Sequence, residues 1–137
     1  MKVEISIGEL VDRVTILSIK KIKMSDPEKL KRVEKEYRLL SQQMISIGIN
    51  EDTEKFKKLK EINLKLWQIE DDIRVKEAKK EFDDEFINLA RGVYHHNDER
   101  SAIKREIDIQ YHSELMEEKE YVDYKNPKEN EDFTHPA

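Results

Sequence analysis

The sequence of 137 residues has no cysteine and little glycine, proline or tryptophan. Because cysteine is absent, the chain has no disulfide, no thiolate nucleophile and no cysteine-bound zinc, and any chemistry has to use oxygen and nitrogen groups. The sequence also lacks a glycine-rich phosphate loop, a Gly-x-Ser-x-Gly elbow and a zinc signature. These absences leave no recognisable catalytic motif.

Long hydrophobic runs are missing as well. No stretch approaches the roughly 18 uninterrupted apolar residues of a membrane span. The first residues, MKVEISIGEL, lack the apolar region of a signal peptide. We therefore expect a cytoplasmic protein that does not enter a membrane.

What the chain has in excess is charge, since 42% of its residues are charged and only 36% are hydrophobic. This balance is typical of long amphipathic helices with solvated outer faces. A chain of this length forms one domain with one modest core. Because thin helical cores often need a partner chain, we expect a homo-oligomer.

The formal net charge of −5 is distributed unevenly. Residues 117–137 contain seven acids and three lysines, so the rest of the chain is nearly neutral, which argues against broad nucleic-acid binding. Within that neutral part, residues 20–38 contain eight bases and four acids, whereas residues 66–88 contain eight acids and four bases. Segments of opposite charge attract each other, within one chain or between two.

Capping residues predict where the first two helices begin. Ser6 and Glu9 form a capping box, which predicts a helix over residues 7–23. Asp26 followed by Pro27 predicts the start of a second helix, because proline is well tolerated at the first helical position. Apolar residues then recur at intervals of three and four as far as the segment IGINED, whose glycine ends the helix.

A third helical rhythm covers residues 53–80, and after KKEFDD a fourth begins. Continuing the fourth rhythm places polar side chains where apolar ones belong, so we predict a kink or break at HHND, residues 95–98. Asn97 or Asp98 would then cap a fifth segment that reaches about residue 120.

These patterns predict an all-α protein, an antiparallel helical bundle of four to five helical segments with long hairpins and a disordered C-terminal tail. The bundle domain is expected over residues 1–121. Residues 122–137 have two prolines, many charges and no periodicity, which is typical of a flexible acidic tail.

A polar stripe runs beside the apolar seam of the third predicted helix. Its members follow one another at intervals of three, four or seven: Phe56, Asn63, Trp67, Glu70 and Arg74. In one interpretation, Glu70 and Arg74 form an ordinary i,i+4 ion pair and Trp67 covers the edge of the core. In the other, these side chains line a cleft together with polar residues of the later helix.

The segment VYHHNDERSAIKREI, residues 93–107, concentrates hydrogen-bonding and titratable side chains. Helix capping and surface pairs explain it without a ligand. Alternatively, Arg100 and Lys104, which are one helical turn apart, hold an anionic group near a helix N-terminus, and His96 acts as an acid or base.

Acidic residues at regular spacing raise the question of a metal site. Carboxylate-bridged di-iron bundles require Glu-x-x-His, which does not occur. Glu51, Glu54, Glu81 and Asp84 match the arrangement of magnesium-dependent helical nucleotide pyrophosphohydrolases, but a chain with 31 acids contains roughly seven acidic i,i+3 pairs by chance. We therefore predict no metal site, and the sequence identifies no cofactor.

Four segments together resemble a known family: GELVDRVTIL (8–17), LWQIEDDIR (66–74), NDERSAIKREI (97–107) and SELMEEKEY (113–121). The family consists of short, functionally uncharacterised proteins of bacteria and their tailed phages, and the resemblance covers most of residues 4–121. It implies an all-helical single domain. The matching positions single out polar residues: Glu9, Asp12, Arg13, Trp67, Glu70, Asp71, Arg74, Asn97, Arg100 and Lys104.

We predict a non-enzymatic binding or scaffolding module with a charged groove between its helices, and with a second copy or an anionic small molecule as partner. The alternative is a small metal-dependent hydrolase or transferase that acts on a nucleotide or sugar phosphate. The residues expected at the groove are Asp12, Arg13, Trp67, Glu70, Arg74, Asn97, Asp98, Arg100 and Lys104.

Overall fold

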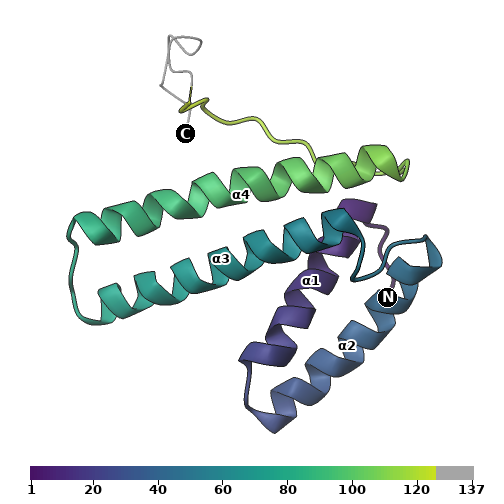
Figure 1. Ribbon diagram of the computed structural model, residues 1–137, viewed down its shortest axis with the longest axis horizontal. Helices are drawn as coiled ribbons and strands as arrows, with labels where there is room; N and C mark the ends of the chain where they lie inside the picture. The colour runs from purple at the N-terminus through teal and green to yellow at the C-terminus, as the bar shows by residue number, and fades with distance from the viewer. Residues whose placement is uncertain (126–137) are drawn as a thin grey trace.

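The computed structural model describes residues 1–125, and within them the chain forms four α-helices and no strand. The helices are α1 (Ile7–Lys23), α2 (Pro27–Ser46), α3 (Glu54–Ala78) and α4 (Asp84–Gln110). The prediction of an all-α protein built from long hairpins is therefore confirmed (Figure 1).

Side-chain caps fix the start of three helices. The hydroxyl oxygen of Ser6 accepts a hydrogen bond from the backbone N–H of Glu9 at 3.1 Å, as the capping box predicts. The carboxylate of Asp26 accepts from backbone N–H groups in the first turn of α2. Asp83 caps α4 in the same way, through the N–H of Phe86 at 3.0 Å.

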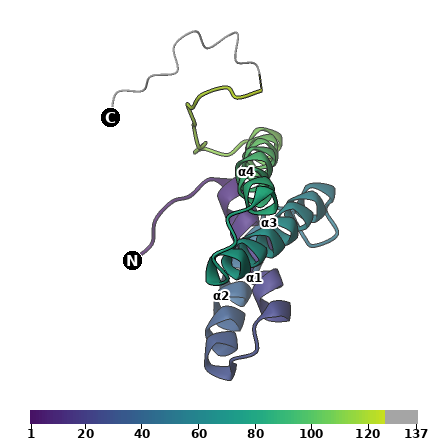
Figure 2. The same cartoon turned by 90° about the vertical axis from the view of Figure 1, so that its left-hand side faces the viewer.

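The helices form two antiparallel hairpins that cross near their base (Figure 1, Figure 2). α1 pairs with α2, and Gly48 at φ 89° ends this hairpin in the left-handed conformation that glycine adopts without strain. α3 pairs with α4. The backbone of α1 lies close to all three other helices, whereas that of α2 lies close to α1 alone. α1 is therefore the element that connects the two hairpins.

The hydrophobic core lies where the hairpins cross. It consists of fully buried side chains from all four helices and from the loop after α2: Val11, Val14, Met44, Ile49, Phe56, Leu59 and Ile107. Between residues 67 and 106 no hydrophobic side chain is buried. The far part of the α3–α4 hairpin is thus an arm whose apolar seam stays partly exposed.

The predicted break at residues 95–98 is wrong, because α4 runs without interruption from Asp84 to Gln110. Asn97 and Asp98 cap no helix. Instead, their side-chain oxygens accept hydrogen bonds from Arg100 and from the hydroxyl of Tyr124. Arg100 can occupy the apolar phase of this helix because Asp12 of α1 pairs with it.

The predicted fifth helix, ending near residue 120, is also wrong. The helix ends at Gln110, and residues 111–125 form a non-helical segment that we call the C-terminal strap. The strap turns back and runs antiparallel to α4, since Glu117 contacts Lys104 while Tyr124 contacts Asp98 further toward the start of the helix (Figure 1).

The flexible tail predicted for residues 122–137 falls partly on the strap. Residues 122–125 continue the strap, and Tyr124 among them is bound to α4. Residues 126–137 lie outside the described part of the chain, so that part of the prediction is untested.

The closest approach of α1 to α4 depends on Gly8. Its backbone N–H donates to a carboxylate oxygen of Asp108 at 2.6 Å, and a Cβ added here would collide with the backbone carbonyl oxygen of Lys104. We expect Gly8→Ala to lower the free energy of unfolding by about 1–3 kcal/mol, as overpacking does. Urea denaturation followed by circular dichroism measures this loss.

Gly92→Ala is the matched control, since the added Cβ would meet the flexible end of Ile69 at 3.2 Å and His96 Nδ1 at an ordinary contact distance of 3.9 Å. Alanine also has the higher helix propensity, so this variant should be as stable as the wild type or more stable. Equal unfolding midpoints for the Gly8 and Gly92 variants would contradict the close approach of α1 and α4.

Candidate functional site

A buried carboxylate, that of Asp12 on α1, lies at the centre of the polar residues between the helices. Its side chain is about 1% exposed. One oxygen accepts from Arg100 Nε of α4 at 2.9 Å and from Asn63 Nδ2 of α3 at 2.9 Å, and the other accepts from Arg100 Nη2. A single side chain thus links three helices.

The neighbours of Asp12 complete this network. Asn63 also donates to Thr15 Oγ1 at 2.8 Å, and Thr15 donates in turn to the backbone carbonyl oxygen of Asp12 at 2.6 Å. The hydrogen bonds to Asp12 are the main reason that the pKa of Arg100 is raised, against the opposing effect of burial. Among the described residues, no buried side-chain nitrogen or oxygen atom lacks a partner.

A second ionic cluster lies one turn away and joins α1, α4 and the strap. Lys104 Nζ donates to Glu9 Oε2 at 2.6 Å and to Glu117 Oε2 at 3.0 Å. Burial alone would raise the pKa of Glu9, but its bonds to Lys104 and Arg13 outweigh this effect and lower it. Burial likewise opposes the charge of Lys104, yet its two carboxylate partners raise its pKa.

A small pocket of about 190 Å³ opens beside Arg100, between α1, α3 and α4. Its lining combines apolar and polar side chains: Ile16, Ile19, Asn63, Leu66, Trp67, Glu70, Asn97 and Arg100. Arg100 Nη1 also donates to Asn97 at 3.4 Å, so three of its nitrogens have partners within the chain.

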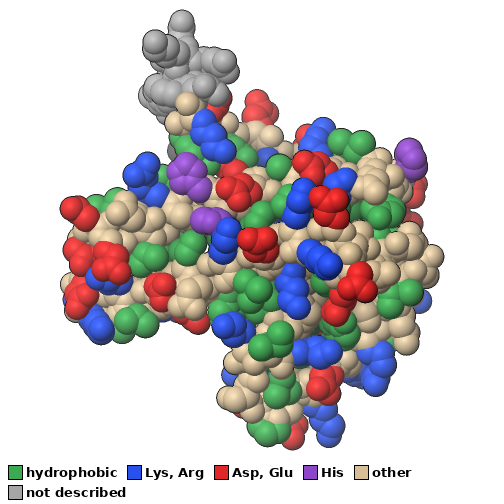
Figure 3. Space-filling view, viewed as in Figure 1, with side chains coloured by type: hydrophobic (Ala, Val, Ile, Leu, Met, Phe, Trp, Pro, Cys, Tyr) green, Lys and Arg blue, Asp and Glu red, His purple; other side chains and the backbone are tan. Residues whose placement is uncertain are grey.

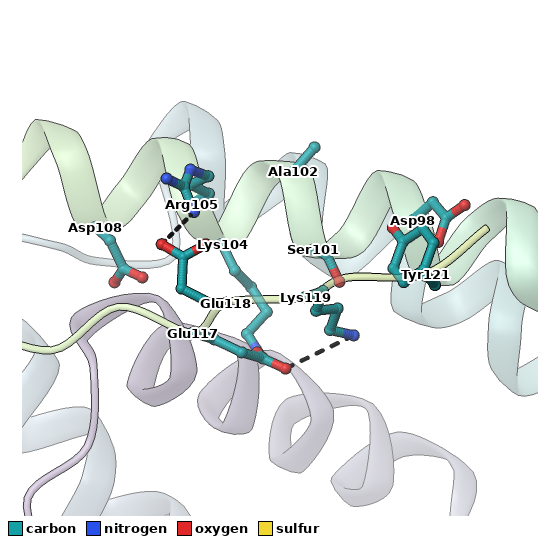
Figure 4. Close-up of a pocket in the computed structure, with 10 residues that line it drawn as sticks. All are labelled: Asp98, Ser101, Ala102, Lys104, Arg105, Asp108, Glu117, Glu118, Lys119 and Tyr121. Carbon is teal, nitrogen blue, oxygen red and sulfur yellow. Dashed lines mark hydrogen bonds and ion pairs between the residues drawn. The ribbon is translucent and has the colours of Figure 1, made fainter. Parts of the chain in front are cut away.

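A second pocket, of about 230 Å³, lies between α4 and the strap (Figure 4). We call it the strap groove. Its lining is Asp98, Ser101, Ala102, Lys104, Arg105, Asp108, Glu117, Glu118, Lys119 and Tyr121. Arg105 Nη1 donates to Glu118 at 3.1 Å across the groove.

At its far end, the strap contacts an aromatic cluster on α4. The rings of Tyr94, His95 and Tyr124 have their centroids 5.0 Å apart in each pair. The hydroxyl of Tyr124 donates to Asp98, which raises the pKa of Tyr124 to about 12. Hydrogen bonding to Asp98 also raises the pKa of Tyr121.

The structure brings together part of the residue set predicted from the sequence. The pocket of about 190 Å³ is lined by four of them: Trp67, Glu70, Asn97 and Arg100. Arg100 also binds the buried Asp12. These side chains come from three helices. The polar stripe of α3 therefore forms one side of this pocket.

The other predicted residues lie elsewhere. Asp98 and Lys104 line the strap groove. Arg13 is exposed and pairs with Glu9 at 3.1 Å within α1. Arg74 is exposed, and no ion pair joins it to Glu70 in the described part of the chain.

Several residues of the network were not singled out from the sequence as site residues. Asn63 had a visible signal, because it belongs to the polar stripe of the third predicted helix, although it was not among the residues expected at the groove. Glu117 had none, since it lies in a segment without periodicity and reaches Lys104 only because the strap folds back.

The four carboxylates that matched a magnesium-site spacing lie at opposite ends of α3. Glu51 and Glu54 stand at its start and Glu81 and Asp84 follow its end, and a helix of 25 residues is about 37 Å long. They cannot meet at one ion within one chain. No three histidine or acidic side chains of residues 1–125 are grouped so that they could hold a metal ion.

None of the four helices in the described residues is long and apolar enough to cross a bilayer. A family model described as a family of unknown function (DUF6165) matches residues 1–130. No curated protein and no solved structure shows a significant match to the chain.

The bond between Tyr124 and Asp98 gives a titration that can be measured. We expect absorbance titration of the five tyrosines to show Tyr124 ionising near pH 12, and Asp98→Asn to return its pKa toward the ordinary 10.0. Since the folded pKa is raised, the bond stabilises the strap below pH 10 and this contribution is lost as the pH rises through 12.

Tyr37 is the internal control for this titration, because burial and its bond to Glu51 raise its pKa to about 12 as well. Asp98→Asn should leave Tyr37 unchanged, and Glu51→Gln should shift Tyr37 alone. If every tyrosine of the wild type ionises near pH 10, the strap does not bind Asp98 in solution.

Proposed function

The chain belongs to a family of unknown function, DUF6165. We propose that it is a non-enzymatic scaffolding module that pairs with a second copy. Two arms of opposite charge make the contact. The basic arm is residues 20–38, at the tip of the α1–α2 hairpin, and the acidic arm is residues 66–88, at the tip of the α3–α4 hairpin. The proposal places the protein in the cytoplasm.

The observation that carries this proposal is that the two arms do not pair within one chain. The basic arm has eight bases and four acids, and the acidic arm has the reverse. They lie at the far ends of two diverging hairpins, and no ion pair joins them among the described residues (Figure 1). Figure 3 shows acidic side chains gathered over the tip of the α3–α4 hairpin, at the left of the view.

Within the acidic arm, one base holds the turn together. Lys76 Nζ lies 3.0–3.1 Å from the carboxylates of Glu81, Asp83 and Glu85, and these hydrogen bonds raise its pKa. This clamp fixes the turn between α3 and α4. Other acids of the arm, such as Asp71, are exposed and form no ion pair with any residue that the structure describes, so they remain available to a basic surface.

Exposed apolar side chains accompany the charges on both arms. Val75, Phe82 and Ile87 of the acidic arm are 50–56% exposed, and Ile22 of the basic arm is 71% exposed. Beyond Leu66, the acidic arm buries no apolar side chain. Covering this surface would add about 25 cal/mol per Å² to the attraction between the charges.

Two-fold symmetry suits this arrangement. When the basic arm of one copy meets the acidic arm of the other, the same contact forms twice and the assembly closes as a dimer. The network around Asp12 supports this function by holding the two hairpins, and hence the two arms, in one relative orientation.

An anionic small molecule is a less suitable partner for Arg100 and Lys104 than a second copy is for the arms. Arg100 is already paired with Asp12, and Lys104 with Glu9, and both carboxylates belong to α1. An anion would have to compete with carboxylates that the fold holds in place, at an effective concentration that free ligands seldom reach.

We expect light scattering after size exclusion to give twice the chain mass of 16.4 kDa at low salt and a value nearer the monomer at about 1 M salt, where charges are screened beyond roughly 3 Å. Lys31→Glu with Arg32→Glu should make the protein monomeric, and so should Asp71→Lys with Glu77→Lys. Each pair of substitutions leaves its arm with six acids and six bases, which cancels the net charge of that arm. Mixing the two variants should restore association through one contact, because the unchanged acidic arm of one then meets the unchanged basic arm of the other.

Lys2→Glu with Lys57→Glu is the matched control, because it changes the net charge as much as the basic-arm variant does but lies outside both arms. This variant should associate as the wild type does. A wild-type monomer at every salt and protein concentration, or a dimer that both arm reversals leave intact, would overturn the proposal.

A further inference from the structure

The C-terminal strap occupies α4 in the manner of a bound peptide. It has no helix, and it meets α4 through side chains in antiparallel order, Glu117 with Lys104, Glu118 with Arg105 and Tyr124 with Asp98. Figure 4 shows the strap passing over the groove with its acidic side chains directed at the two bases. This surface is separate from the two charged arms.

The strap is held weakly. None of its side chains is buried, and its apolar residues Leu115 and Tyr121 are 43% and 54% exposed. The ion pair between Arg105 and Glu118 is exposed on both sides, and such pairs contribute little stability. Segments with few buried apolar contacts open locally far more often than the whole protein unfolds.

The floor of the groove is held by residues other than the strap. Lys104, 8% exposed beneath the strap, is also bound to Glu9 of α1 at 2.6 Å, a contact that does not involve the strap. Asp108 is fixed by the backbone N–H of Gly8 at 2.6 Å. The binding surface is therefore formed before any segment enters it, which lowers the cost of binding.

The residues of the groove define what it accepts. Lys104 and Arg105 present two adjacent cations to carboxylates, and Asp98 accepts a hydrogen bond from a tyrosine hydroxyl. The strap meets these groups with the pattern Glu-Glu-x-x-Tyr-x-x-Tyr, residues 117–124. The small side chains of Ser101 and Ala102 leave room for an extended backbone beside α4.

We infer that the strap groove is a docking site for an extended acidic, tyrosine-bearing segment of a partner protein, and that the chain's own strap covers it until such a segment displaces it. Binding in this groove goes beyond the pairing of two copies through their arms. The two proposals use different surfaces, so either can fail while the other holds.

The test uses the full chain with the strap weakened by Glu117→Gln, Glu118→Gln and Tyr124→Phe, which remove its ion pairs with Lys104 and Arg105 and the hydroxyl bond to Asp98 without adding positive charge. The probe is a fluorescent peptide with the sequence of residues 114–125, and fluorescence anisotropy measures its binding. We expect the opened variant to bind the peptide about tenfold more tightly than the wild type, whose groove is free only in the fraction with the strap displaced.

Two additions to the opened variant separate specific binding from general attraction. Arg105→Glu should abolish binding, whereas Arg91→Glu, which makes the same charge change on an exposed part of α4 outside the groove, should leave it intact. Equal binding of a scrambled peptide, or equal loss with both substitutions, would overturn the inference. A dimer of the opened variant that persists when the arm charges are reversed would also overturn it, since a second copy would then be the occupant.

Hydrogen exchange of the wild type provides a measurement that does not depend on the folding of the variant. An excess of the peptide should increase the exchange of the Ser113 amide, which donates to the backbone carbonyl oxygen of Asp108 at 2.8 Å where the strap begins, because the peptide displaces the strap from the groove. If this exchange is unchanged at a peptide concentration that saturates the opened variant, the peptide does not displace the strap.

Discussion

The pairing of the Asp12 carboxylate with Arg100 is the interaction on which the rest of the structure depends. It joins α1 to α4, and Asn63 of α3 donates a hydrogen bond to the same carboxylate oxygen that accepts from Arg100 Nε. Burying such a pair gives little net stability, but removing one partner costs about 3–5 kcal/mol because the other charge is left uncompensated. We therefore attribute to this network the relative orientation of the two hairpins, and we attribute most of the stability to the apolar core beneath it.

The consequence of this arrangement is a molecule with a firm base and two extended ends. The core lies where the hairpins cross, and no hydrophobic side chain between residues 67 and 106 is buried. Charges that meet near the base are paired within the chain, whereas those at the tips face solvent with opposite sign. These are the features on which we base the two proposals, pairing of two copies through the arms and docking of a segment in the groove that the strap covers.

Much of this fold could be predicted from local signals. The caps at Ser6 and Asp26 and the spacing of apolar residues gave the long helices, because both depend on neighbours within one turn. The continuity of α4 could not be predicted, since Arg100 and Asp98 are satisfied by Asp12 and Tyr124, which only folding brings near. Helical phase placed Trp67 and Glu70 on one stripe, but it could not show that Arg100 of α4 lies against them or that Arg74, one turn further, faces solvent.

Whether the Asp12 network sets the orientation of the two hairpins is tested most directly by measuring the distance between them with the network intact and with it disturbed. The chain has no cysteine, so spin labels at Lys29→Cys on α2 and Lys79→Cys after α3 report one distance when labelled protein is diluted in unlabelled protein. We expect one narrow distance distribution for the protein with Asp12 intact. Arg13→Gln should retain it, because this change disturbs an exposed pair on α1, whereas Asp12→Asn should broaden it. An Asp12→Asn protein with the same narrow distribution would show that the core alone sets the orientation of the hairpins.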